Sequence, residues 1–212
     1  EDFLSSHFYN YDDFSDPDYN GGIVFDTLQN ENASKTPLSS QVSKQVISVK
    51  TADGNFIDHS LYYLIAREGT GIIPATVDST YLSYEGLLLN KTVFDSSSTP
   101  VWFDLTSVVR GFREGAHKFK SGDFKVNEDN TVDFFGYGQG AIFFPSGLGY
   151  FSRTSGAVPA YAPLIFKINL YGVNQTDHDG DGILSADEFD NDGDGVPDDT
   201  DEDGTPDYLD AD

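Results

Sequence analysis

The sequence predicts an α+β chain in which a curved antiparallel sheet wraps around one short helix and a loop-rich acidic tail follows. Short apolar and β-branched runs, separated by turn residues, recur from residue 61 to residue 105 and are typical of strands. Residues 108–117 have apolar side chains at helical spacing instead. The last 36 residues carry 16 Asp or Glu and no Lys or Arg, with Gly recurring among them, which predicts loops.

Residues 1–59 are predicted to form an N-terminal extension without recognisable chemistry. Four side chains at helix-like spacing predict a short amphipathic helix in residues 1–10. Residues 36–50 are compatible with a helix or a strand that ends at Asp53-Gly54. Between them, residues 11–22 are interpreted as a loop that packs through Tyr11, Phe14 and Tyr19.

The central part begins with an apolar strand over residues 61–67, which stops at a Glu-Gly-Thr-Gly turn. Residues 81–98 predict two strands joined by a turn, and residues 101–105 predict the next strand. After the helix over residues 108–117, residues 118–140 contain two β-rich runs around a polar turn. This segment therefore predicts an inserted hairpin.

The hairpin over residues 81–98 ends in Phe94-Asp95-Ser96-Ser97, where an aromatic ring stands beside one carboxylate. Such a combination is the usual composition of a small-ligand pocket. Together with Tyr84-x-Gly86-x-Leu88, this segment resembles the signature of FKBP-type peptidyl-prolyl isomerases. Further blocks of that signature follow in the same order, and the resemblance covers about residues 61–173. These blocks are Pro100-Val-Trp-Phe-Asp-Leu105, Val108-Val-Arg-Gly-Phe-Arg-Glu-Gly115, Pro145-Ser-Gly-Leu-Gly-Tyr150, Val158-Pro159 and Leu164-Ile-Phe166.

The resemblance implies a domain over residues 60–174 with the fold of that family and with isomerase activity that needs no cofactor. Its substrates would be proline-containing polypeptides, and its role that of a folding helper. The site that the resemblance implies consists of apolar and aromatic side chains with one acid: Tyr84, Phe94, Asp95, Val108, Val109, Phe112, Tyr150 and Phe166.

Roles within this site also follow from the resemblance. Phe112 would form the floor, where the family often has Trp, and the Val109 N–H and Tyr150 hydroxyl would donate to substrate carbonyls. Asp95 would accept hydrogen bonds and orient the site without transferring a proton. Because Phe112 is smaller than Trp, and because Tyr150-Phe151 replaces the usual Tyr-Gly, we expect low activity or an altered substrate range.

Two alternatives remain open from the residues alone. In the first, the same side chains are the ordinary core of a barrel-like sheet. In the second, the chain is a non-catalytic binding or cell-surface module that keeps the pocket for a proline-containing or macrolide-like ligand, with calcium stiffening its spacer. A third interpretation makes calcium-dependent adhesion the main function.

The acidic tail, residues 175–212, repeats the pattern of a calcium loop. Asp177 to Glu188 has Asp at positions 1, 3 and 5, Gly at 6 and Glu at 12 of a twelve-residue loop. The spacing recurs from Asp190 and again from Asp199, with Pro at position 8, which hinders an exiting helix. These later loops look like those of thrombospondin type 3 repeats, although a disordered acidic tail is the alternative. The expected Ca²⁺ ligands are Asp177, Asp179, Asp181, Ile183, Glu188, Asp190, Asp192, Asp194, Val196, Asp198, Asp199, Asp201, Asp203, Thr205, Asp207 and Asp210.

Composition limits the other partners and the location. A net charge of −24 argues against nucleic acid or anionic membrane and favours calcium ions, and the absence of Cys excludes disulfides and thiolate chemistry. No apolar run reaches the roughly 18 residues of a membrane span. The chain starts at Glu1 without Met, so we expect a processed product with lipid or surface anchoring upstream of residue 1. Millimolar Ca²⁺ outside the cytoplasm favours a periplasmic, surface-attached or secreted protein.

Overall fold

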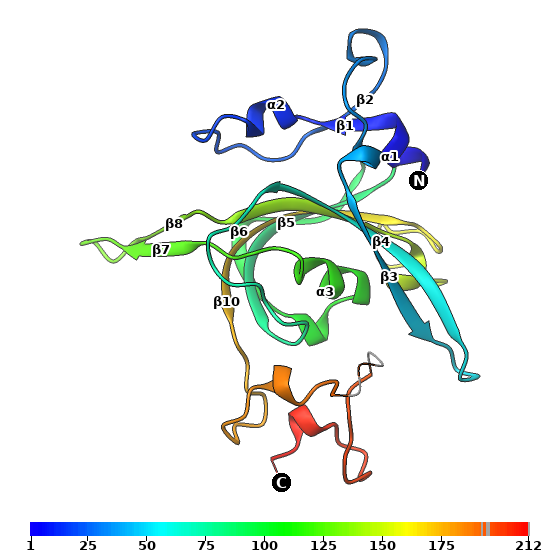
Figure 1. The fold of residues 1–212 in the computed structure, drawn as a ribbon, viewed down its shortest axis with the longest axis vertical. Helices are drawn as coiled ribbons and strands as arrows, with labels where there is room; N and C mark the ends of the chain where they lie inside the picture. The colour runs from blue at the N-terminus through cyan, green and yellow to red at the C-terminus, as the bar shows by residue number, and fades with distance from the viewer. Residues whose placement is uncertain (192, 194–195, 212) are drawn as a thin grey trace.

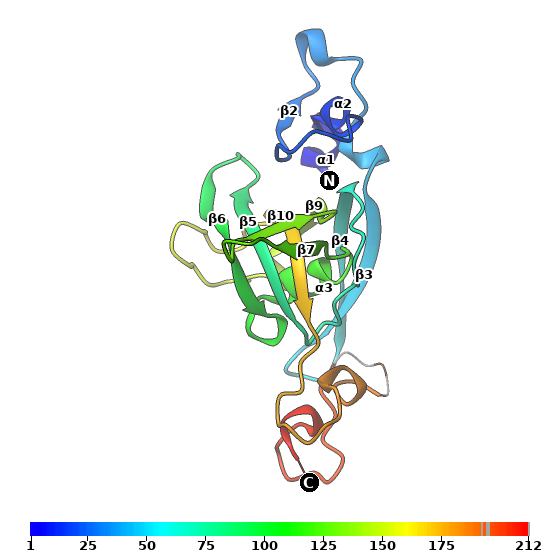
Figure 2. The ribbon, with the colours of Figure 1, turned by 90° about the vertical axis from the view of Figure 1, so that its left-hand side faces the viewer.

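The computed structural model describes residues 1–191, 193 and 196–211, and three parts follow one another along its long axis (Figure 1). The N-terminal extension packs on one side of a curved sheet, helix α3 (Arg110–Ala116) lies inside the curve, and the acidic tail lies beyond it. Figure 2 shows the extension and the tail at opposite ends of the molecule. The sheet and α3 therefore form the central body that carries both ends.

Six strands form the sheet in the order β3-β4-β9-β10-β5-β6, and every neighbouring pair is antiparallel. This arrangement confirms the predicted antiparallel sheet wrapped around a short helix. The strands are β3 (Ser43–Lys50), β4 (Phe56–Arg67), β5 (Ser79–Leu88), β6 (Val93–Asp104), β9 (Gly138–Phe144) and β10 (Leu164–Asn174).

The strand bounds differ from the sequence pattern in two places. A register shift between the pairs Leu82–Val101 and Tyr84–Ser97 allows β6 to continue through two segments that were predicted as separate strands. Residues 36–50, left open between helix and strand, form a 3-10 turn (Leu38–Ser40) and β3. Because β3 pairs with β4, the sheet begins well before residue 60, and the expected boundary at residue 59 falls inside β4.

Apolar side chains fill both faces of the sheet, so there are two cores. The concave core packs Phe112 and Ala116 of α3 against Leu82, Phe144 and Phe166. The convex core packs the extension against the opposite face of the sheet. Every residue of β9 is buried, because this strand lies between both cores. The main residues of the convex core are Phe3, Leu4, Ile23, Phe25, Leu38, Leu64, Leu87, Phe143 and Ile165.

The extension contains more regular structure than its sequence predicts. Its elements are α1 (Asp2–Ser6), β1 (His7–Tyr9), α2 (Tyr11–Phe14), β2 (Phe25–Thr27) and the 3-10 turn Asn30–Asn32. The helix predicted in residues 1–10 ends early because β1 pairs with β2. The predicted loop begins with one helical turn, yet it packs as expected: the Phe14 ring centroid lies 5.9 Å from that of Tyr9 and 5.1 Å from that of Tyr19.

The inserted hairpin consists of β7 (Asp123–Val126) and β8 (Val132–Phe135), as predicted. Asn130, in its turn, has φ 65°, in the left-handed region that Asn tolerates better than most residues. The remaining 3-10 turns of the body are Leu105–Ser107 before α3 and Ser146–Leu148 after β9. The hairpin extends away from the sheet in Figure 1, and its Phe124 side chain is exposed.

The described part of the tail is folded against the body and contains two 3-10 turns, Ser185–Asp187 and Asp207–Leu209. His178 Nε2 lies 3.4 Å from Asp104 Oδ2, and the Arg113 guanidinium lies 5.5 Å from the centre of the Phe189 ring, within cation–π range. These contacts attach the tail to the residues on either side of the 3-10 turn before α3. Among the described residues, no helix is both long and apolar enough to cross a membrane.

Candidate functional site

Aromatic rings from four elements meet on the concave face of the sheet. The ring centroids of Phe112, on α3, and Phe166, on β10, are 5.0 Å apart. Phe94, on β6, lies 5.4 Å from Phe166, and Tyr84, on β5, lies 6.2 Å from Phe112. Most of these pairs meet edge to face, the arrangement that aromatic quadrupoles favour. The structure therefore brings together four of the predicted side chains.

Strand register explains how the rings meet. Gly86 on β5 is directly opposite Phe166 on β10 and Asp95 on β6. A Cβ at Gly86 would lie 2.7 Å from the Phe94 ring and 3.0 Å from the Phe166 ring. The absence of a side chain at this position leaves the space that the two rings occupy.

Asp95 and Tyr84 form the polar part of the site. The Tyr84 hydroxyl donates a 2.8 Å hydrogen bond to Asp95 Oδ2. Burial, followed by this hydrogen bond and the Asp95 charge, raises the pKa of Tyr84 to about 12. Tyr84 therefore remains a hydrogen-bond donor at neutral pH, and the exposed carboxylate of Asp95 is held at the edge of the aromatic cluster.

The other predicted residues border the cluster. Val108, Val109 and Tyr150 are half-buried and pack against the concave core. Val109 is the N-cap residue of α3, and its carbonyl accepts hydrogen bonds from the N–H groups of Phe112 and Arg113. All eight residues predicted for the site therefore lie in or beside one aromatic cluster.

Two further rings belong to this cluster and were not predicted. Phe103 lies 5.4 Å from Tyr84 and 5.8 Å from Phe112, and Phe144 stacks on Phe166 at 5.8 Å. Alternation along β6 was the available signal for Phe103, since its neighbour Trp102 is exposed. No comparable signal marked Phe144, because β9 is buried on both faces.

A cavity of about 470 Å³ lies elsewhere, on the convex side of the sheet. Its lining includes Ile23 of the extension, Ser83 and Lys167. Tyr84 is the one predicted site residue among the residues that line it. The other rings of the cluster do not line this cavity.

The first and third loops of the tail share one set of hydrogen bonds. In the first loop, the Gly182 N–H, at position 6, donates to Asp177 and the Ile183 N–H, at position 7, donates to Asp181. In the third loop, Gly204 donates to Asp199 and Thr205 to Asp203 in the same way. Gly182 and Gly204 have φ 101° and 99°, which Gly adopts without the cost that other residues incur.

Position 9 closes each loop. Its side chain accepts from the N–H of position 2 in three pairs: His178 N–H to Ser185, Asn191 N–H to Asp198, and Thr200 N–H to Asp207. Asp198 and Asp207, predicted as ligands, therefore have a structural role in shaping their loops. Position 9 is Ser185 in the first loop and Asp in the other two. The residue type therefore does not repeat, and the sequence pattern did not reveal the shared role.

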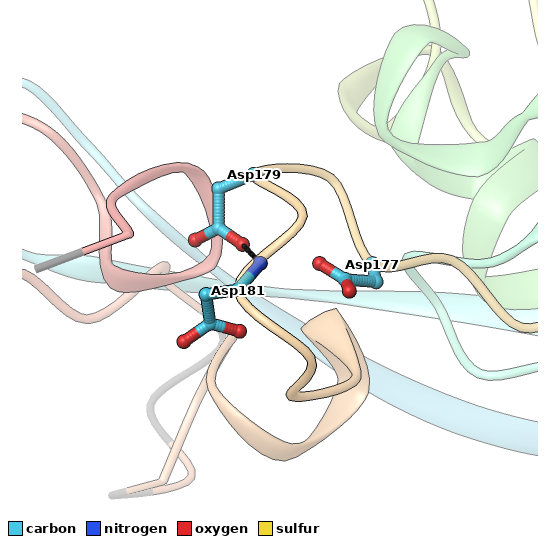
Figure 3. Close-up of side chains that lie close together, drawn as sticks. All are labelled: Asp177, Asp179 and Asp181. Carbon is cyan, nitrogen blue, oxygen red and sulfur yellow. Dashed lines mark hydrogen bonds between the residues drawn. The ribbon is translucent and has the colours of Figure 1, made fainter.

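Carboxylates gather inside the first and third loops. Oxygen atoms of Asp177, Asp179 and Asp181 lie within 4.8 Å of one another, and Figure 3 shows the three side chains around one turn. Burial, followed by the charges of Asp181, Asp179, Asp177 and Asp207, raises the pKa of Glu188. Glu188 Oε2 and Asp179 Oδ2 are buried without a protein hydrogen-bond partner. These oxygens would suit a hard cation.

The other predicted ligands are placed less uniformly. Asp199, Asp201 and Asp203 form a second such group, so Asp201 lies with the third loop. Asp201 and Asp210 line a cavity of about 310 Å³ together with Asp181, Glu188 and Asp207. Val196 is exposed, and Asp190 lines a cavity beside α3. Asp192 and Asp194 lie outside the described residues.

Comparison with known proteins places the central body in a family. Residues 72–171 match the family model described as FKBP-type peptidyl-prolyl cis-trans isomerase. The chain is 29% identical to the FKBP-type peptidyl-prolyl cis-trans isomerase FkpA of Aeromonas hydrophila, over 74% of this chain and 51% of that protein. It is 30% identical to the peptidyl-prolyl cis-trans isomerase Mip of Coxiella burnetii, over 68% of this chain and 56% of that protein. A crystal structure of a peptidyl-prolyl cis-trans isomerase from Pseudomonas syringae covers 60% of this chain, with 25% identity and a TM-score of 0.45.

The short helix and the aromatic cluster lie in the segment that matches the peptidyl-prolyl cis-trans isomerase family. All eight predicted site residues fall inside the matched segment. The domain is of the FKBP type, as its sequence predicted. The chain spans about half the length of the two curated relatives.

Proposed function

We propose that this chain catalyses the cis–trans isomerisation of X-Pro bonds in polypeptides and that the aromatic cluster on the concave face is its active site. The observation that carries this proposal is the ring cluster around Phe166, with Asp95 bound to Tyr84 at its edge. Six rings from β5, β6, α3, β9 and β10 meet in this cluster. The half-buried rings Tyr84, Phe94 and Phe103 are its accessible part, and one carboxylate provides orientation.

The chemistry requires no proton transfer. Resonance holds the X-Pro bond planar, with a barrier of about 18 to 20 kcal/mol. The twisted transition state loses this conjugation, so its carbonyl is less polar than that of the planar amide. An apolar aromatic surface therefore favours the twisted form over the planar form, which is selective binding of the transition state. Asp95, through its bond to Tyr84, keeps the tyrosine side chain in place.

An isomerisation assay with a proline peptide tests this proposal. Phe166→Leu preserves burial but removes the ring, and Asp95→Asn weakens the bond to Tyr84. We expect each to lower kcat/KM by about tenfold or more, a loss of about 1.4 kcal/mol of transition-state stabilisation. Phe124→Ala, which removes an exposed ring on the inserted hairpin, serves as the control. Unchanged rates in both site variants would reject this active site.

We further propose that the tail binds Ca²⁺ as a structural ion. Asp177, Asp179, Asp181 and Glu188 would hold an ion in the first loop, and Asp199, Asp201 and Asp203 would hold one in the third. The bound ion would neutralise carboxylates that repel one another at present spacing. The support is the group of unpartnered buried oxygens together with the repeated loop hydrogen bonds.

Calcium titration tests the proposal for the tail. We expect Ca²⁺ at about 10⁻⁴ to 10⁻³ M, the range of extracellular modules, to protect residues 177–211 from protease. Asp181→Asn should weaken this protection. Asp187→Asn, an exposed acid in the same loop outside the ligand positions, should retain it. Equal cleavage with Ca²⁺ and with chelator would reject calcium binding.

Taken together, these proposals describe a folding helper for exported proteins. Loops of moderate calcium affinity would be filled where Ca²⁺ is millimolar, outside the cytoplasm. A periplasmic, surface-attached or secreted location follows from this argument. Fractionation of the cells that make the protein would test it, and recovery in the cytoplasm alone would contradict it.

A further inference from the structure

The loop between β9 and β10 holds two exposed aromatic rings close to the proposed active site. Phe151 and Tyr161 are 58% and 62% exposed. Their ring centroids are 5.5 Å apart with the planes at 79°, and the Tyr161 N–H donates a 2.6 Å hydrogen bond to the Phe151 carbonyl. The loop extends away from the sheet in Figure 2, in yellow. The rings thus form one fixed pair on the surface.

Both residues have an unusual backbone conformation. Phe151 has φ 50° and Tyr161 has φ 62°, in the left-handed region where a Cβ is unfavourable and Gly is favoured. Strained residues of this kind persist where the surrounding structure enforces them, and they cluster at functional sites. A chain that needed only the turn would be better served by Gly at both positions.

The pair is attached directly to the active site. Tyr150 precedes Phe151, Ala162 follows Tyr161, and both neighbours pack against the concave core. Val158, at the middle of the loop, is 2% exposed and belongs to the same core. The base of the loop is therefore anchored in the concave core beside the proposed active site, while Phe151 and Tyr161 remain exposed to solvent.

We propose that Phe151 and Tyr161 form a binding subsite for an aromatic or large apolar side chain of the polypeptide, outside the X-Pro pair itself. This inference rests on the proposed isomerase function. An extended chain advances about 3.3 to 3.6 Å per residue, so a side chain two or three residues from the proline lies about 7 to 11 Å away. We expect a side chain at that distance to reach the loop that begins at Tyr150. Aromatic pairs of this kind provide binding energy at low conformational cost.

Two series of peptides test the subsite. Each pair has Phe or Ala at one position, three residues before the proline in one series and three residues after it in the other, with the residue before proline held constant. We expect the natural protein to prefer Phe over Ala by about two- to tenfold in kcat/KM in one series. Phe151→Gly and Tyr161→Gly suit the observed φ values, so they remove the rings while the loop keeps its path. Each should reduce the preference to about one.

Phe124→Ala is the matched control, since it removes an equally exposed ring on the inserted hairpin, and it should preserve the preference. Thermal unfolding checks that the glycine variants remain folded. Equal rates for Phe and Ala peptides in both series, or a preference that survives both glycine variants, would overturn the subsite and leave the isomerase proposal intact. Failure of the natural protein to isomerise any peptide would overturn the isomerase proposal and the subsite with it.

Discussion

A methyl group at Gly86 should reduce isomerase activity more than it reduces stability. The added Cβ would lie 2.7 Å from the Phe94 ring and 3.0 Å from the Phe166 ring, whereas carbon contacts are optimal at about 3.5 to 4.0 Å. The Phe94 ring must therefore move by roughly 0.8 Å. Phe166 is buried between Phe112 and Phe144, while Phe94 is half-buried, so Phe94 gives way toward solvent.

The magnitudes follow from this movement. Overpacking a core costs about 1 to 3 kcal/mol, and we expect the lower end because Phe94 can move. For a chain of this size that corresponds to a fall in Tm of about 2 to 4 °C. Displacement of a positioning group by about 1 Å can cost about a hundredfold in rate, so Gly86→Ala should lower kcat/KM by tenfold to about a hundredfold.

A proline-peptide isomerisation assay and a thermal melt measure the two effects. Gly172→Ala is the matched control, since its Cβ would meet Tyr81 at 3.6 Å, an ordinary contact in the same sheet. We expect that control to retain both activity and Tm. If Gly86→Ala kept the kcat/KM of the natural protein, the assignment of these rings to the active site would be refuted. A loss of kcat/KM no larger than that of Gly172→Ala would refute it too.

Three other perturbations have defined outcomes. Tyr84→Phe removes the hydrogen bond to Asp95 and should slow isomerisation several-fold. Because the raised pKa of Tyr84 favours the folded state below pH 10, the natural protein should lose stability between about pH 10 and pH 12. Denaturant titrations should show a smaller loss for the variant over that interval. Phe189→Ala should free the tail from Arg113 at a cost of about 3 to 5 kcal/mol of local stability, seen as faster proteolysis of residues 177–211 with isomerase activity retained. Gly140→Ala places a Cβ 2.1 Å from a backbone oxygen of β4, so it should destabilise the whole fold by about 3 kcal/mol or more, with a Tm at the natural value as the contrary result.

The central body could be predicted from sequence because its signals are local. Apolar side chains in the β5–β6 hairpin are interrupted at a turn, and those of α3 recur at helical spacing. The sequence blocks of the family also occur in order, so the residues around Asp95 could be assigned from their place in these blocks. Phe103 could have been found from the alternation along β6, whereas Phe144 could not, because its membership of the cluster depends on which strands lie side by side. The pairing of β9 with β4 and β10 brings Phe144 onto Phe166, and no local pattern encodes it.

In the tail, sequence spacing predicted where the acids gather but not what each acid does. Acid spacing in the first loop located Asp177, Asp179 and Asp181, and the structure groups their oxygens. The loop-closing role of Asp198 and Asp207 depends on backbone N–H groups seven residues earlier. The spacing of acids in the sequence does not indicate hydrogen bonds to backbone N–H groups. A carboxylate that closes a loop therefore cannot be distinguished by spacing from one that binds an ion.

The convex core has a practical consequence for anyone who trims this protein. Expressing it from residue 60 onward would remove β3 and expose Leu64, Phe143 and Ile165, which residues 1–59 now shield from water. The shortened product would expose a hydrophobic patch beside an unpaired edge of β4, a combination that promotes aggregation. A shortened form of this chain must therefore retain the N-terminal extension.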